Sequence, residues 1–186
     1  MKAFGSDGWS WLNAPAAWEG GDGLTVAAEP GTDFWRTTHY GYDRDTGHVF
    51  GHTTEGDFAV TTTFSAAYRE LYDQAGVMLR IDERNWIKTG IEYVGGEHLL
   101  SVVVTRDVSD WSVIPLAISP DSVTLAVNRT GDTVTVRYGL DGAEPVTMAR
   151  LAYFPPTVPV LAGVMCASPE GTGFSVTFST LEITSL

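Results

Sequence analysis

The chain has 186 residues, of which 44% are hydrophobic and 18% charged, and its formal net charge is −12. This length fits a single domain spanning residues 1–186 with a substantial core, and the composition is that of a folded globular protein. The acidic balance leaves no basic patch, so neither nucleic acid nor an anionic membrane surface is expected as a partner.

The chain reads as a series of short strands separated by turns. Apolar and polar residues alternate with a period of two, which is the pattern of strands with one buried face. In chain order the main strands are expected at 24–28, 34–38, 49–52, 57–64, 76–81, 86–93, 100–105, 123–127, 134–138, 146–153, 158–167 and 174–183.

The pattern between these strands points to the same fold class. The alternation slips by one residue between Phe178 and Leu181, which predicts a β-bulge. Residues 66–73 hold the only short helical pattern. About a dozen strands with closely spaced turns predict an all-β sandwich or barrel.

The single cysteine and the start of the chain bear on the compartment. Cys166 has no second cysteine to pair with, and its apolar surroundings favour a small buried hydrophobe over a catalytic thiol. The first residues, MKAFGSDGWSWLN, contain no uninterrupted apolar segment of the signal-peptide kind, and no apolar run reaches the length of a bilayer. We therefore expect a cytoplasmic protein.

The stretch from Tyr72 to Ser112 has an unusual second face. Its strands carry aliphatic residues such as Val77 and Leu79 on one side. Because strand side chains alternate, the other side gathers a polar set. This set comprises Arg80, Trp86, Lys88, Glu92, Ser101 and Thr105.

We interpret this polar face as a ligand site. Carbohydrate sites combine flat aromatic rings with groups that hydrogen-bond hydroxyls, and Gly76 and Gly90 would leave room for a ligand. The candidate ligand-binding residues are Trp35, Gln74, Arg80, Trp86, Lys88, Glu92, Ser101, Asp110 and Trp111. The structural alternative is a cross-strand ion-pair network in which Arg80 is the partner of Glu92, with the tryptophans packed in a core.

No metal or other cofactor is expected. His39, His48 and His52 match no compact ligand spacing, and no loop is dense enough in Asp and Asn to hold calcium.

Five motifs occur in an order that resembles a known family. They are Asp33-Phe34-Trp35, Tyr72-Asp73-Gln74-Ala75-Gly76, Trp86-Ile87-Lys88-Thr89-Gly90-Ile91-Glu92, Ser109-Asp110-Trp111-Ser112 and Arg150-Leu151-Ala152-Tyr153-Phe154-Pro155. They resemble the regulation-of-enolase protein family, a domain of unknown function with a concanavalin A-like fold. The resemblance implies a jelly-roll sandwich of two curved antiparallel sheets, with a concave groove like those that bind glycans in lectins and glucanases.

Three functions follow as hypotheses. The leading one is a lectin-like, carbohydrate-binding protein that takes a small molecule or oligosaccharide on the concave face. The second is a sugar-active enzyme, an isomerase, lyase or hydrolase, with Glu92 and Lys88 as catalytic candidates. Hydrolysis is the weakest of these, because glycosidases pair two facing carboxylates and only the distant Asp73 and Asp110 are at hand. The third is a regulatory domain that binds a protein partner. The sequence leaves the oligomeric state open.

Overall fold

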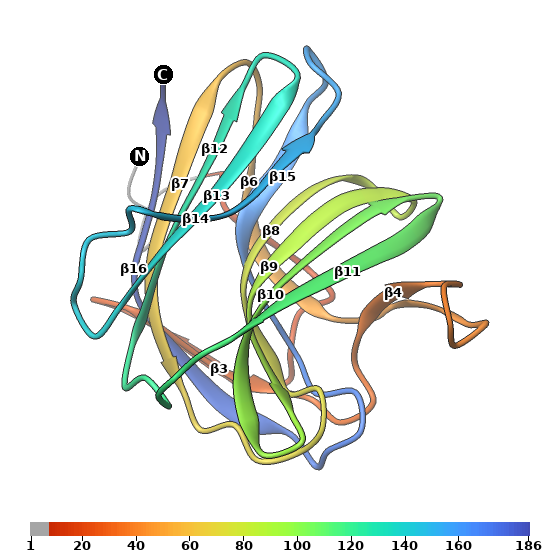
Figure 1. Cartoon of the computed structure of the whole chain (residues 1–186), viewed down its shortest axis with the longest axis vertical. Coiled ribbons are helices and arrows are strands. Elements are labelled where there is room, and N and C mark those ends of the chain that lie inside the picture. Colours follow the sequence, from red (N-terminus) through yellow and green to blue (C-terminus); the bar gives the residue numbers. More distant parts are fainter. Residues whose placement is uncertain (1–7) are drawn as a thin grey trace.

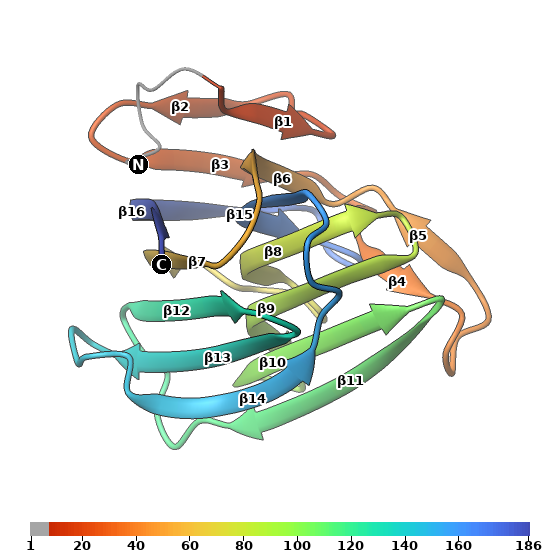
Figure 2. The same cartoon turned by 90° about the horizontal axis from the view of Figure 1, so that it is seen from above.

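The computed structural model describes residues 8–186, and within that range it contains strands and loops but no helix. Two large antiparallel sheets pack face to face as a sandwich (Figures 1 and 2). The all-β jelly-roll class expected from the sequence is therefore confirmed.

The first sheet, here called the pocket sheet, has seven strands. In spatial order they are β1 (Ser10–Leu12), β6 (His48–Thr54), β15 (Val160–Ala167), β8 (Gln74–Asp82), β9 (Asn85–Val94), β10 (Glu97–Arg106) and β11 (Val108–Pro115). Its strands β8–β11 curve, and the short hairpin of β4 (Phe34–Arg36) and β5 (Asp43–Asp45) lies on its outer side (Figure 1).

The second sheet, here called the back sheet, also has seven strands. They run β14 (Thr147–Tyr153), β13 (Thr133–Leu140), β12 (Val123–Thr130), β7 (Phe58–Ala66), β16 (Phe174–Ser185), β3 (Leu24–Ala28) and β2 (Trp18–Gly20). A tight turn between Thr130 and Thr133 joins β12 to β13 as a hairpin.

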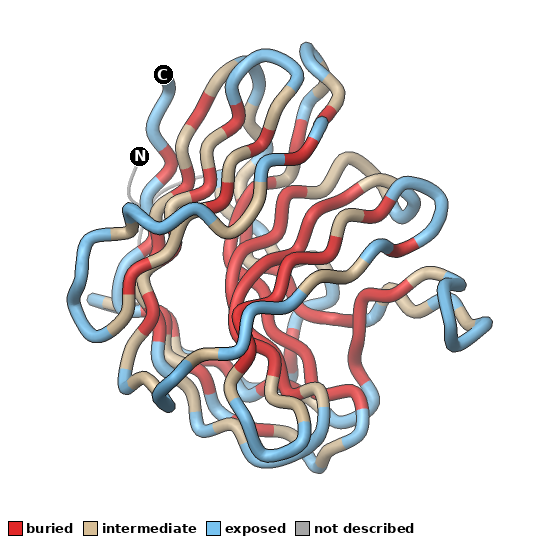
Figure 3. Tube along the Cα trace, in the orientation of Figure 1, coloured by how far each residue is buried: buried red, intermediate tan, exposed pale blue. Residues whose placement is uncertain are grey.

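The main core lies between the two sheets, and the buried stretches line their facing surfaces (Figure 3). From the pocket sheet, Val77, Leu79, Ile87, Ile91 and Leu100 point inward, and each is at most 1% exposed. A fully buried side chain of this kind contributes roughly 1.5–3 kcal/mol through removal of apolar surface from water. The inner face thus holds the sandwich together.

A bulge interrupts β16 where the alternation slips in the sequence. The pairing of β16 with β7 shifts register between Phe178 and Thr180. The Thr62 hydroxyl donates to the Thr180 carbonyl at 2.6 Å, and the Thr180 hydroxyl accepts from the Thr63 N–H at 2.9 Å. These bonds supply partners at the point where the ladder is disrupted, and the predicted bulge is confirmed.

The short helical pattern at residues 66–73 does not form a helix. Instead the buried Asp73 carboxylate accepts hydrogen bonds from the backbone N–H groups of Arg69 and Glu70, both at 3.0 Å. Its other oxygen accepts from the Ser168 hydroxyl at 2.6 Å. Aspartate that bonds nearby backbone in this way competes with helix formation. The result is a fixed loop that leads into β8.

Gly76 and Gly90 face one another across β8 and β9. A Cβ atom on Gly76 would lie 2.0 Å from the Thr89 carbonyl oxygen, and one on Gly90 would lie 2.0 Å from that of Ala75. The close approach of the two backbones requires these glycines, so space for a ligand is not needed to explain them.

Two further expectations concern Cys166 and the membrane. Cys166 is buried at 1% exposure, and burial raises the pKa of its thiol, as expected for a small core residue. Within residues 8–186, no helix is long and apolar enough to cross a bilayer. The first seven residues, which belong to the stretch inspected for a signal peptide, lie outside the described range.

Candidate functional site

The β4–β5 hairpin covers much of the outer face of the pocket sheet. On one side Arg80 of β8 binds Asp45 of β5 with both guanidinium arms, at 2.7 and 2.8 Å. On the other side the backbone N–H of Arg36 donates to the Ser109 hydroxyl of β11 at 2.9 Å. The hairpin therefore spans the curved face and is held at both edges.

A small second core lies beneath the hairpin. The Phe34 and Trp86 rings meet edge to face with centroids 6.2 Å apart, and the cluster also contains Trp35, Val49, Met78, Val103 and Met165. Trp86 belongs to the polar face predicted from the sequence, and Phe34 of the hairpin covers it. The face is thus divided between a packed part and an open part.

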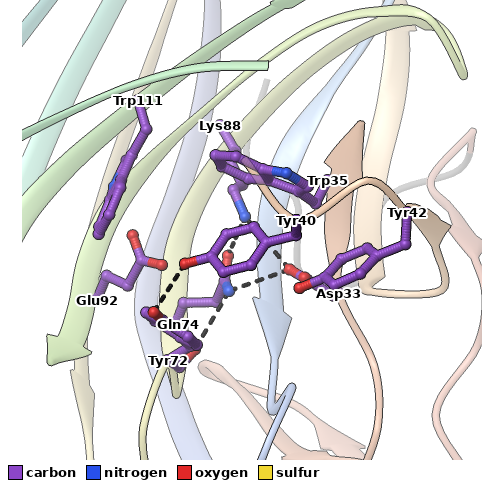
Figure 4. A pocket seen from close by; sticks show the side chains of 9 residues that line it. All are labelled: Asp33, Trp35, Tyr40, Tyr42, Tyr72, Gln74, Lys88, Glu92 and Trp111. Atoms are coloured by element: carbon purple, nitrogen blue, oxygen red, sulfur yellow. Dashed lines mark hydrogen bonds and ion pairs between the residues drawn. The ribbon is translucent and has the colours of Figure 1, made fainter. Parts of the chain in front are cut away.

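The open part is a pocket of about 290 Å³ of empty space, counting its mouth. Its walls come from the hairpin, from the loop before β8, and from β8, β9 and β11. The lining residues are Asp33, Trp35, Tyr40, Tyr42, Tyr72, Gln74, Lys88, Glu92 and Trp111 (Figure 4).

The polar floor of the pocket is a buried triad. The Lys88 ammonium group donates to Gln74 Oε1 at 2.6 Å and pairs with Asp33 Oδ1 at 3.4 Å. The Gln74 amide donates to the same Asp33 oxygen at 3.3 Å. All three residues are at most 5% exposed. Lys88 is therefore a fixed, charge-balanced donor.

Glu92 lies beside this triad but does not join it. It is 7% exposed, and its Oε2 atom has no hydrogen-bond partner among residues 8–186. Burial raises the pKa of the Glu92 carboxyl group, and the nearby Lys88 charge offsets only part of that effect. Arg80, the partner that the ion-pair alternative assigned to Glu92, is instead bound to Asp45, so that pairing is wrong.

Four aromatic rings enclose the pocket, and we call them the aromatic box: Trp35, Tyr40, Tyr72 and Trp111. Around this cycle, neighbouring ring centroids lie 5.5, 6.4, 6.4 and 6.5 Å apart, and the rings cross at 75°, 74°, 81° and 90°. Each ring is thus close to perpendicular to the next, and all four line the pocket (Figure 4).

The polar atoms of the box are held within the protein. The indole N–H of Trp35 donates to the Thr38 carbonyl at 2.8 Å, and that of Trp111 donates to the Ser101 hydroxyl at 2.9 Å. The Tyr40 and Tyr72 hydroxyls bond one another at 2.8 Å across the mouth (Figure 4). The two indoles therefore offer ring surface to a ligand, while the tyrosines offer ring surface and two exchangeable hydroxyls.

Five of the sequence-predicted site residues meet in this pocket: Trp35, Gln74, Lys88, Glu92 and Trp111. Ser101 lies in an adjoining recess, where its hydroxyl holds Trp111.

Three other candidates lie elsewhere. Arg80 anchors the hairpin, and Trp86 is 1% exposed within the second core. Asp110 points away and lies 3.8 Å from Arg150 of β14.

Sequence reasoning missed four residues of the pocket: Asp33, Tyr40, Tyr42 and Tyr72. Asp33 and Tyr72 stand in two of the five family motifs, and this motif membership could have identified them as pocket residues. Tyr72 adopts the left-handed backbone conformation, with φ of 66°. Tyr40 and Tyr42 lie in a loop without periodicity, and no local pattern shows that this loop folds over the sheet.

The histidines do not form a metal site. His48 accepts from the Glu29 N–H at 3.2 Å and bonds the Asn13 carbonyl at 2.7 Å, while His52 bonds the Gly8 carbonyl. Across residues 8–186, no three His, Cys, Asp or Glu side chains are grouped as metal ligands would be.

Comparison with known proteins gives this geometry a context. Residues 11–186 match a family model described as Protein of unknown function (DUF1349). Regulation of enolase protein 1 of Saccharomyces cerevisiae is 36% identical over 176 residues, which cover 94% of this chain and 88% of the relative.

Solved structures agree with this assignment. The crystal structure of a functionally unknown protein from Saccharomyces cerevisiae matches with a TM-score of 0.91 at 36% identity, over 96% of this chain and 97% of that one. The carbohydrate binding module CBM66 from Bacillus subtilis shares the fold, with a TM-score of 0.62 at 13% identity over 98% of this chain and 99% of that one. This chain therefore belongs to the DUF1349 family and is a relative of yeast Regulation of enolase protein 1.

Proposed function

We propose that this protein is a lectin-like carbohydrate-binding protein that holds one sugar unit in the pocket. The observation that carries the proposal is the combination of the aromatic box with buried, fixed polar groups in one small cavity. Small-molecule sites are typically concave and mostly apolar, with a few placed polar groups.

The chemistry of the pocket suits a sugar ring. Apolar C–H faces of a sugar stack on aromatic rings, which Trp35 and Trp111 offer. Hydroxyl groups need both donors and acceptors, and Lys88 and Glu92 supply one of each. Since both are largely removed from water, each hydrogen bond to the ligand is formed in a medium that strengthens it.

The size and the closure of the pocket set the extent of the ligand. The hairpin covers the sheet next to it, and the Arg80–Asp45 pair holds the hairpin down. The empty space of about 290 Å³ includes open solvent at the mouth, so the enclosed part of the pocket is smaller than a typical small-molecule site of roughly 300–1,000 Å³. These features favour a single sugar unit over a long internal stretch of glycan.

Binding is better supported than catalysis. An acid–base pair of Glu92 and Lys88 needs a lysine that is free to exchange a proton, and Lys88 is bound to Asp33 and Gln74. The shared fold of the carbohydrate binding module CBM66 also favours a binding role.

We place the protein in the cytoplasm, because a single buried thiol suits a reducing compartment.

The test is isothermal titration calorimetry against a panel of mono- and oligosaccharides. We expect at least one to bind, and Trp111→Ala to weaken that binding more than tenfold. Trp18→Ala is the matched control, because Trp18 is half exposed on β2 of the back sheet and should leave affinity unchanged. Circular dichroism of both variants checks the fold.

A panel in which no saccharide binds would contradict the proposal. It would favour the regulatory alternative, for which the relative's name and an exposed apolar edge speak. Met148, Leu151 and Tyr153 of the edge strand β14 are 57%, 59% and 48% exposed. Turnover of a bound sugar, lost in Glu92→Gln while binding persists, would favour the enzyme instead.

A further inference from the structure

Glu92 differs from the other buried acids of the chain. Asp33 accepts from the Phe34 N–H at 2.8 Å and pairs with Lys88, and Asp73 accepts three hydrogen bonds. Glu92 has an oxygen with no partner in the described chain, and no cation lies within ion-pair distance of it there. Burying a carboxylate oxygen without a partner is costly, so a ligand that supplies the missing partner would gain that free energy.

The charges around the pocket leave one negative charge unbalanced. Asp33 and Lys88 neutralise one another at 3.4 Å. Once Glu92 is ionised, the pocket therefore carries a net charge of −1, from two acids and one base. A cationic group on the ligand would restore neutrality without disturbing the triad.

The aromatic box surrounds the space that such a cation would enter. Figure 4 shows the Glu92 carboxylate pointing toward the space between Trp111 and Tyr40. Ring faces carry negative potential, and a cation within about 6 Å of a ring centroid is attracted by roughly 0.5–2 kcal/mol. The four rings contact one another with neighbouring centroids 5.5 to 6.5 Å apart, and all of them line the pocket beside Glu92, so a cation that enters the pocket lies close to ring surface.

The charge of the whole chain acts in the same direction. A net charge of −12 draws cations toward the surface and raises their association rate. The same negative charge would lower the association rate of an acidic sugar.

We propose that the sugar bound in this pocket is an amino sugar, whose protonated amine enters the aromatic box and pairs with Glu92 Oε2. This inference rests on the proposed carbohydrate-binding function and names its ligand class. The sugar ring stacks on Trp111 or Trp35, and its hydroxyls reach the Lys88 donor and the tyrosine hydroxyls at the mouth. An N-acetylated or plain sugar lacks the charge that Glu92 requires.

The experiment compares three sugars that differ at one position. D-glucosamine, N-acetyl-D-glucosamine and D-glucose are titrated into the protein by calorimetry at a pH where the free amine is protonated, and the galactose and mannose series repeat the comparison. In at least one series we expect the amino sugar to bind more than tenfold tighter than its two counterparts. Glu92→Gln should remove that preference, while Glu97→Gln, an exposed glutamate on β10, should keep it.

The outcomes separate the two proposals. Equal or tighter binding of the plain or N-acetylated sugar overturns the amino-sugar inference and leaves carbohydrate binding intact. A preference for the amino sugar that survives Glu92→Gln also overturns it, since a nonspecific attraction to the acidic surface would behave in that way. Failure of every sugar in the panel overturns both.

Discussion

Ile91 and Glu92 are neighbours on β9, and they show how differently the two faces of the pocket sheet are built. Ile91 is 1% exposed and packs into the hydrophobic core between the sheets. Glu92 is 7% exposed and points to the opposite face, among Lys88, Trp111 and the tyrosines. One strand thus serves stability with one side chain and offers an unsatisfied charged group with the next.

The aliphatic inner side chains of β9 need no polar partner, whereas Glu92 on its outer face has an oxygen that lacks one. Aliphatic side chains need only to be packed, and any well-filled arrangement satisfies them. A buried carboxylate oxygen without a partner, such as Oε2 of Glu92, is a cost that folding must bear. Natural proteins retain such costs chiefly at functional sites, and this difference is the reason to look for a ligand at Glu92.

The largest expected effect comes from breaking the triad at the pocket floor. Lys88→Met leaves Asp33 as a buried charge without its cation, and we expect a loss of about 3–5 kcal/mol in the free energy of unfolding. Urea denaturation measures it. The double variant Lys88→Met with Asp33→Asn removes both charges and should recover much of the loss. A single variant as stable as the parent chain would mean that the pair is not formed.

Truncation on the inner face should have the next largest effect. Ile91→Ala removes buried methyl groups and leaves a cavity, at an expected cost of about 2–5 kcal/mol in unfolding free energy. Sugar affinity of the folded fraction should stay within twofold, because the pocket lies on the opposite face. A large change in affinity with little change in stability would contradict the division between the faces.

The sequence predicts the inner face well, because a strand with one buried face alternates apolar and polar residues with a period of two. The same alternation correctly groups Lys88, Glu92 and Ser101 on one side, and the slip before Leu181 locates the bulge. These features are local. They depend on side-chain order along one strand and on nothing that is distant in the chain.

The pocket is less predictable, because its walls come from segments far apart in the sequence. Tyr40 meets Tyr72 only because the β4–β5 loop folds over the sheet, and no periodicity marks that loop. Trp86 and Lys88 share a face, yet the hairpin buries Trp86 beneath Phe34 and leaves Lys88 in the pocket. Which part of a polar face stays open depends on tertiary contacts such as Arg80 with Asp45.

Removing the unsatisfied charge should stabilise the protein. We expect Glu92→Gln, which keeps the shape and removes the charge, to raise the free energy of unfolding at neutral pH by about 1.4 kcal/mol for each unit by which the folded pKa exceeds the unfolded one. Because burial raises the pKa of Glu92 in the folded state, the folded chain keeps a proton that the unfolded chain releases near pH ~4.3.

The pH dependence fixes the sign of this effect. Parent stability should fall as pH rises from the unfolded pKa through the folded pKa of Glu92, and the variant should not show that fall. Urea titrations at several pH values would therefore show a gap that closes in acid. A gap that widens toward low pH would mean that Glu92 is stabilised as a carboxylate, contrary to the effect of its burial.

The smallest expected effect is at the mouth of the pocket, where Tyr40→Phe removes the hydroxyl bond to Tyr72. A hydrogen bond contributes about 0.5–1.5 kcal/mol net, and this one is partly exposed, so we expect the lower end of that range. For a chain of this size, 0.5–1 kcal/mol is a fall of roughly 1–4 °C in melting temperature. Tyr72→Phe should cost the same, and the double variant should cost no more than either, since both remove one bond. Additive losses would show that each hydroxyl has another partner. The same small fall in melting temperature in all three variants would show that breaking this bond costs the sandwich little stability. The mouth could then open for a ligand while the Lys88 triad stays in place.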